Sequence, residues 1–73
     1  MLVVERMRLA DFLAELDRYR PGYLRCDPQV ADLRVSGAFP LRAPDDVLAL
    51  LAETLPVRLR SMSRYWVTVL PRG

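Results

Sequence analysis

The sequence has no histidine, no lysine and a single cysteine, Cys26, among its 73 residues. This excludes a mononuclear zinc site of the usual Cys/His kind, a haem-attachment motif and any catalytic triad that needs imidazole. Asp45 and Asp46 are adjacent, but consecutive helix positions point about 100° apart, so we expect them to stabilise a helix start rather than hold a metal. No nucleophile–base set can be assembled, so we predict neither an enzyme nor a cofactor.

Long hydrophobic runs are also missing. The longest apolar run, Val47 to Ala52, is far short of the roughly 20 residues that span a membrane. Charges at Glu5 and Arg6 come too early for a signal peptide. Hydrophobic residues make up 52% of the chain, too many for a disordered tail, so we predict one small domain over residues 1–73. If the protein works outside the cytoplasm, we expect this chain to be a piece of a longer one.

Two hydrophobic periodicities alternate along the chain. Apolar residues recur at helical spacing from Leu9 to Tyr19 before Pro21-Gly22, and again from Pro44 to Leu55 before Pro56. Period-2 alternation and short apolar stretches between turn residues indicate strands elsewhere. The predicted strands cover 2–6, 23–26, 34–41, 57–60 and 65–70, with a turn at 61–64.

This order predicts two β-α-β units, at 2–26 and 34–61, followed by a closing strand. Both helices could cover one face of a four-stranded sheet, or they could lie between two small sheets. The run from Val47 to Ala52 leaves the second helix almost no polar face, which favours burial on all sides. We therefore predict an α+β fold in which two helices are sandwiched between two small sheets.

The stretch "RVSGAFPL" at 34–41 shares a Gly-Ala-Phe sequence with the strand on which RNA-recognition domains stack bases. That strand needs two or three exposed aromatic residues, whereas this one has Phe39 alone and is interrupted by Pro40. We expect Val35 and Phe39 to face the helices. Gly37 in a strand indicates a bulge or the close approach of a helix or another backbone.

Cys26 alternates with Leu24 in a predicted strand. This placement favours a small buried apolar residue, and a free thiol or an intermolecular bridge is the alternative.

Arginine and aromatic residues gather in the last hairpin. Arginine with tyrosine and tryptophan is the composition of protein-interface hot spots, and also of platforms that bind single-stranded nucleic acid. In a third interpretation, the tryptophan is half core and the arginines keep an edge strand soluble. For protein docking, the predicted partner-binding residues are Arg58, Arg60, Arg64, Tyr65 and Trp66, together with Arg34 and Ser36 on the outward face of their strand.

Four motifs give the chain a family resemblance: "RYRPG" at 18–22, "RVSG" at 34–37, "TLPV" at 54–57 and "RYWV" at 64–67. Over residues 9–71 the sequence resembles the C-terminal periplasmic domain of FecR-type anti-sigma regulators. The resemblance implies a fold like the secretin and TonB N-terminal (STN) domain, with helices between two small sheets. The signalling domain of a TonB-dependent transducer or of a secretin has a similar fold and is the alternative.

The same resemblance implies a location and a role. FecR-type proteins cross the inner membrane of Gram-negative bacteria once, and their cytoplasmic part controls an extracytoplasmic-function sigma factor. Their periplasmic part contacts the N-terminal signalling domain of an outer-membrane TonB-dependent transducer that is loaded with a ferric siderophore. We therefore expect a periplasmic protein-interaction domain with no small-molecule substrate. A small nucleic-acid-binding domain is a less favoured alternative.

Overall fold

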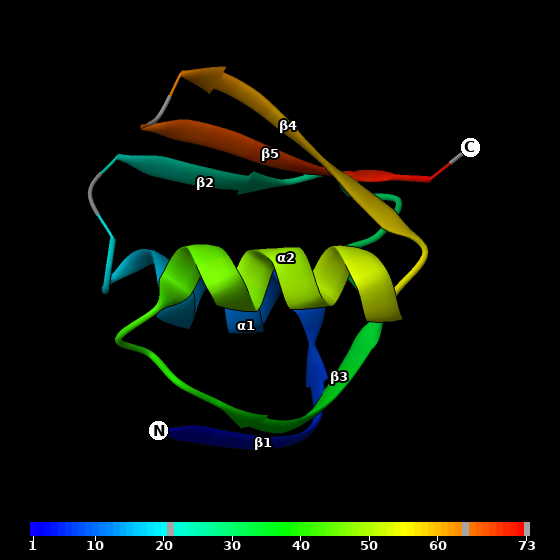
Figure 1. Cartoon of the computed structure of the whole chain (residues 1–73). Coiled ribbons are helices and arrows are strands. Elements are labelled where there is room, and N and C mark those ends of the chain that lie inside the picture. The colour runs from blue at the N-terminus through cyan, green and yellow to red at the C-terminus, as the bar shows by residue number, and fades with distance from the viewer. Residues whose placement is uncertain (21, 64, 73) are drawn as a thin grey trace.

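The computed structural model describes residues 1–20, 22–63 and 65–72. Over these residues it has two helices and five strands, which form two sheets. The two helices lie between the sheets (Figure 1), which confirms the predicted α+β sandwich. The elements are β1 (Leu2–Arg8), α1 (Leu9–Asp17), β2 (Tyr23–Cys26), β3 (Arg34–Phe39), α2 (Pro44–Thr54), β4 (Val57–Ser63) and β5 (Trp66–Pro71).

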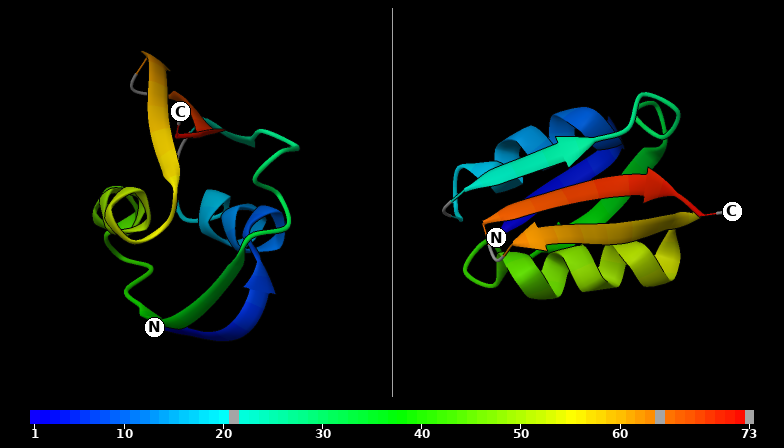
Figure 2. Two further views of the ribbon diagram at one scale, coloured as in Figure 1. Left: turned by 90° about the vertical axis from the view of Figure 1, so that its right-hand side faces the viewer. Right: turned by 90° about the horizontal axis from the view of Figure 1, so that it is seen from above.

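Each β-α-β unit contributes one strand to each sheet. The first strands of the two units, β1 and β3, pair antiparallel in the smaller sheet. Their second strands, β2 and β4, lie on either side of β5, which runs parallel to β2 and antiparallel to β4. Seen from above in Figure 2, β5 is the middle strand of this larger sheet. The closing strand therefore joins the two predicted units.

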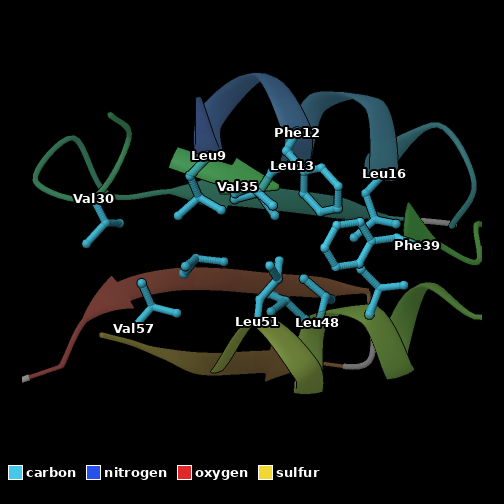
Figure 3. Close-up of a cluster of buried hydrophobic side chains, with 13 residues drawn as sticks. Leu9, Phe12, Leu13, Leu16, Val30, Val35, Phe39, Leu48, Leu51 and Val57 are labelled. Carbon is cyan, nitrogen blue, oxygen red and sulfur yellow. The ribbon is translucent and has the colours of Figure 1, made fainter. Parts of the chain in front are cut away.

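The core lies in the helix layer and on the inner faces of both sheets (Figure 3). Phe12 of α1 and Phe39 of β3 meet edge to face, with ring centroids 4.9 Å apart. Pro40 ends β3 directly after Phe39, as expected of a residue that cannot donate to a sheet. The buried hydrophobic residues are Leu9, Phe12, Leu13, Leu16, Val30, Val35, Phe39, Val47, Leu48, Leu51, Val57, Val67 and Val69.

The burial predicted for the second helix was wrong in extent. Val47, Leu48 and Leu51 of α2 are buried, but Leu50 is 43% exposed. The reason is that α1 and α2 lie side by side in one layer (Figure 2, left), so each helix keeps an outer flank that neither sheet covers. The sandwich follows from the topology, and the apolar flank of α2 is at the surface. Neither helix of the described residues has both the length and the apolar character that a membrane span requires.

Several element ends differ from the prediction, and β3 stops at Phe39, two residues before the predicted end. Helix α1 stops at Asp17, and Tyr19 lies beyond it with 54% of its surface exposed. Strand β1 runs on to Arg8, two residues past the predicted end. Strand β4 continues to Ser63 because it stays paired with β5, through the stretch predicted as a turn. Pro21, predicted to help end the first helix, lies outside the described residues.

Candidate functional site

Alternate residues of β2, β5 and β4 point away from the helices and form one continuous surface, here called the outer sheet face. The intervening residues point inward, and Val67 and Val69 of β5 are buried there. This alternation follows from the period of two along a strand. The outer sheet face consists of Tyr23, Arg25, Arg58, Arg60, Met62, Trp66, Thr68 and Leu70.

An aromatic and cationic cluster occupies one end of this face. Tyr23 and Trp66 are directly paired across β2 and β5, and their rings lie 5.4 Å apart at an angle of 51°. The guanidinium carbon of Arg25 lies 5.6 Å from the centre of the Trp66 ring, within the range of a cation–π contact. Trp66 remains 39% exposed. It therefore stands on the outer sheet face rather than in the core, with two neighbours that fix its position.

A hollow of about 370 Å³ adjoins the cluster. Met62 of β4 and Leu70 of β5 line it with apolar groups, Trp66 and Thr68 complete the lining from β5, and Arg60 adds a cation. Concave sites with an apolar lining and few polar groups are the usual form of binding pockets. This one can accept a bulky apolar side chain and hold an anion next to it.

The charge of the outer sheet face has one sign. Its three arginines are Arg25, Arg58 and Arg60, and the sequences of β2, β4 and β5 contain no Asp or Glu. Arg25 and Arg60 both pair with Thr68, from opposite sides of β5. Within the described part of the chain, no carboxylate forms an ion pair with any of the three. The face is therefore basic and its cations are available to an external anion.

The structure brings together part of the predicted partner-binding set. Arg58, Arg60 and Trp66 share the outer sheet face. Tyr65 lies just before β5, 51% exposed, and its carbonyl accepts a hydrogen bond from the Tyr23 backbone N–H at 2.5 Å. Arg64 lies outside the described residues.

Sequence reasoning missed Tyr23 and Arg25, which complete the cluster around Trp66. Both occupy outward positions of a predicted strand. However, nothing in the sequence indicated that this strand pairs in parallel with β5, more than 40 residues later. Met62 was missed because its segment was predicted as a turn, whereas it belongs to β4.

Arg34 and Ser36, also predicted to bind a partner, lie on the other sheet and hold a bulge in β1. The pairing of β1 with β3 shifts register between Val4 and Met7, and Arg6 within this bulge has φ 53°. Ser36 Oγ accepts a hydrogen bond from the Arg6 N–H at 2.9 Å, and Arg34 Nη1 donates to the Arg6 carbonyl at 3.1 Å. These side chains therefore stabilise the β1 bulge. The helix layer separates them from the outer sheet face.

Gly37 lies beside this bulge and has φ 140°. It pairs with Val4, the last residue before the register shift. A Cβ at Gly37 would meet the Phe39 ring at 3.4 Å, which is ordinary contact. The predicted bulge is therefore present, on the partner strand. The expected close approach of a helix or another backbone is absent among the described residues, because the nearest group is a side chain of the same strand.

A second hollow, of about 350 Å³, lies on the inner side of the larger sheet beside α2. Arg20 reaches it with a side chain that is only 6% exposed, and its Nη2 lies 3.5 Å from Asp45 Oδ1. This ion pair links the segment before β2 to the first turn of α2. It connects the two β-α-β units. Arg20, part of the "RYRPG" motif, therefore has a structural role in the fold.

Cys26 ends β2 on its inner side. It is partly buried and packs against the core, close to the apolar placement predicted for it. Burial, and then the nearby Asp27 carboxylate, raise the pKa of its thiol above the ordinary value. The thiol therefore keeps its proton to higher pH than an ordinary cysteine, which lowers its reactivity near neutral pH.

Comparison with known proteins adds no family to this description. No family model matches the chain, and no match to a curated protein is found.

Proposed function

We propose that this chain is a protein-interaction module, the C-terminal periplasmic signalling domain of a FecR-type anti-sigma regulator. Its partner is the N-terminal signalling domain of a TonB-dependent outer-membrane transducer. The observation that carries the docking role is the outer sheet face, where Trp66 contacts both Tyr23 and Arg25 of the neighbouring strand and adjoins an apolar hollow. The choice of family rests on the four sequence motifs and on the sandwich of two β-α-β units that the family would require.

The physical argument for docking concerns the composition and the pre-organisation of this face. Tryptophan, tyrosine and arginine dominate interface hot spots, because each buries a large area with a polar group at its end. Trp66 is already held by its two neighbours, so little side-chain freedom would be lost on binding. Partners can also add a strand at the free edges of β2 and β4, where main-chain groups give affinity and side-chain pockets give selectivity.

The relay to a sigma factor would require parts of a regulator beyond these residues. In this proposal the chain contributes recognition on the periplasmic side, and the bound state of the transducer is its input. Iron or siderophore availability would thus reach the sigma factor through a contact between two folded domains.

The test is a calorimetric titration of the chain with purified N-terminal signalling domains of TonB-dependent transducers from the same organism. We expect one of them to bind, and the double variant Trp66→Ala/Arg60→Ala to bind at least about tenfold more weakly, because hot-spot truncations cost about 2 kcal/mol or more. Arg42→Ala, exposed between β3 and α2, is the matched control. Far-ultraviolet circular dichroism checks that each variant is folded.

Two results would count against the proposal. If no transducer domain binds, the assigned partner is wrong. If a domain binds and the double variant binds it equally well, the outer sheet face is not the interface. The sequence upstream of the chain in its full-length protein, with or without a membrane span, separates a regulator from the signalling domain of a transducer or secretin.

A second candidate, from another class, is a small nucleic-acid-binding domain. The observation in its favour is the set of three arginines on a sheet face without acidic residues. Binding of oligo-dT measured across salt concentrations tests it, since phosphate contacts give a steep loss of affinity as salt rises. Absence of binding at low salt removes this candidate.

A further inference from the structure

We infer that the outer sheet face binds an acidic segment of a partner protein, with one bulky apolar side chain of that segment inserted in the hollow beside Trp66. This inference rests on the proposed docking function and specifies the chemistry of the partner. It follows from three properties of the face, namely the sign of its charge, the lining of its hollow and its dimensions.

Charge complementarity selects an acidic occupant. Arg25 and Arg60 lie on either side of Thr68 across three adjacent strands, and Arg58 lies next to Leu70 on β4. By contrast, Arg8 and Arg18 elsewhere in the fold face Asp32 and Glu15 at 2.8 and 3.9 Å. All nine acidic residues of the chain lie outside the three strands of this sheet. A segment that brings carboxylates to this row would meet no repulsion from the sheet itself.

The hollow selects an apolar side chain rather than a nucleic-acid base. Met62 and Leu70 line it with flexible apolar groups, and Trp66 is the single aromatic residue of its lining. The Trp66 ring carries the Arg25 guanidinium over it, and Tyr23 is tilted 51° away from the plane of Trp66. The two rings therefore do not form a flat platform for successive bases. An aliphatic or aromatic side chain of a protein fits this lining better.

The dimensions of the face favour contact with a short segment of the partner over contact with a broad rigid surface. The three strands have four, seven and six residues, and at about 3.3 Å per residue and about 4.8 Å between strands they give a face of roughly 270 Å². A standard protein interface buries about 800 Å² on each partner. The face is therefore the size of a contact with one short stretch of chain, and we expect modest affinity from it alone.

The experiment measures fluorescence anisotropy of a short labelled peptide of alternating Glu and Asp with one central Leu. We expect the intact chain to bind it. Replacing the central Leu by Ala should weaken binding about tenfold, because the buried apolar area is lost. Arg60→Glu should weaken it by a similar factor, because one attraction becomes a repulsion. Arg42→Glu makes the same change of charge away from the face and should stay within about twofold of the unchanged chain.

Several results would overturn the inference. These are no binding of the acidic peptide, equal loss in the Arg60→Glu and Arg42→Glu variants, or an Ala peptide that binds as well as the Leu peptide. Tighter binding of oligo-dT than of the acidic peptide would replace it with the nucleic-acid candidate.

This experiment and the transducer titration can fail separately. If a transducer domain binds and the peptide does not, the docking function stands and the acidic-segment inference falls. If the peptide binds with the expected variant pattern and no transducer domain does, the inference stands and the assigned partner falls.

Discussion

Gly22 is where the outer sheet face depends most directly on a glycine. It precedes Tyr23 and has φ 97°, a conformation that residues with a side chain rarely adopt. A Cβ placed on it would overlap the backbone carbonyl of Tyr65. That same carbonyl accepts the hydrogen bond from the Tyr23 N–H at the start of the β2–β5 pairing. Replacing Gly22 by alanine should therefore push β2 and β5 apart beside the Trp66 cluster.

Gly37 provides a matched control, because its φ is also positive and its neighbours are not crowded. Replacing either glycine by alanine strains the folded backbone by about 1–3 kcal/mol. The same replacement reduces the entropy of the unfolded chain, which offsets about 0.4–1 kcal/mol of that strain. We expect Gly37→Ala to lower the free energy of unfolding by about 1 kcal/mol. Gly22→Ala should lose in addition about 1 kcal/mol for the hydrogen bond and about 1 kcal/mol for the aromatic contact. Its total is then roughly 3 kcal/mol.

The assay is urea unfolding followed by the fluorescence of Trp66, together with thermal unfolding. In a domain of this size, about 1 kcal/mol shifts the melting temperature by about 4–8 °C. The two variants should therefore melt roughly 10 °C or more apart. Gly22→Ala should also weaken partner binding, because it displaces Tyr23, whereas Gly37→Ala should not. Equal destabilisation by the two substitutions would refute the argument that close backbone approach, and not φ alone, fixes glycine at position 22.

The architecture could be predicted from sequence because hydrophobic periodicity and proline positions are local signals. Pro44 starts α2 and Pro40 ends β3, both where the chemistry of the ring requires. The burial of the second helix on all sides, from which the sandwich was predicted, is nevertheless incomplete. Leu50 belongs to an apolar run but lies on an open flank, because a helix beside another helix needs burial on three sides and not four. Periodicity does not report which side is left uncovered.

The candidate site was predictable where it lies on one hairpin and not where it joins distant strands. Arg60 and Trp66 are close in sequence, and their pairing region follows from the hairpin. Tyr23 and Arg25 come to the same face through a parallel pairing, which leaves no local signal in the sequence. Ser36 was placed correctly as outward-facing. Its use in holding Arg6 depends on a bulge in another strand, which the sequence of its own strand does not show.

Two further predictions concern side chains away from the outer sheet face. Ser36→Ala removes the acceptor of the Arg6 N–H at the β1 bulge, and should lower the free energy of unfolding by about 1 kcal/mol in urea without changing partner affinity. A loss of partner affinity in this folded variant would instead place the smaller sheet in the interface. Cys26 should be alkylated by iodoacetamide in the folded domain only at higher pH than in the urea-unfolded chain, because burial raises its pKa. The folded state thus keeps the thiol proton longer. The contribution of this thiol to the free energy of unfolding is therefore fully present below the pKa of the unfolded thiol. It declines as pH rises from there through the pKa of the folded thiol, and Cys26→Ala should remove this decline. Identical alkylation profiles for folded and unfolded chains would show that the thiol is not desolvated by the core.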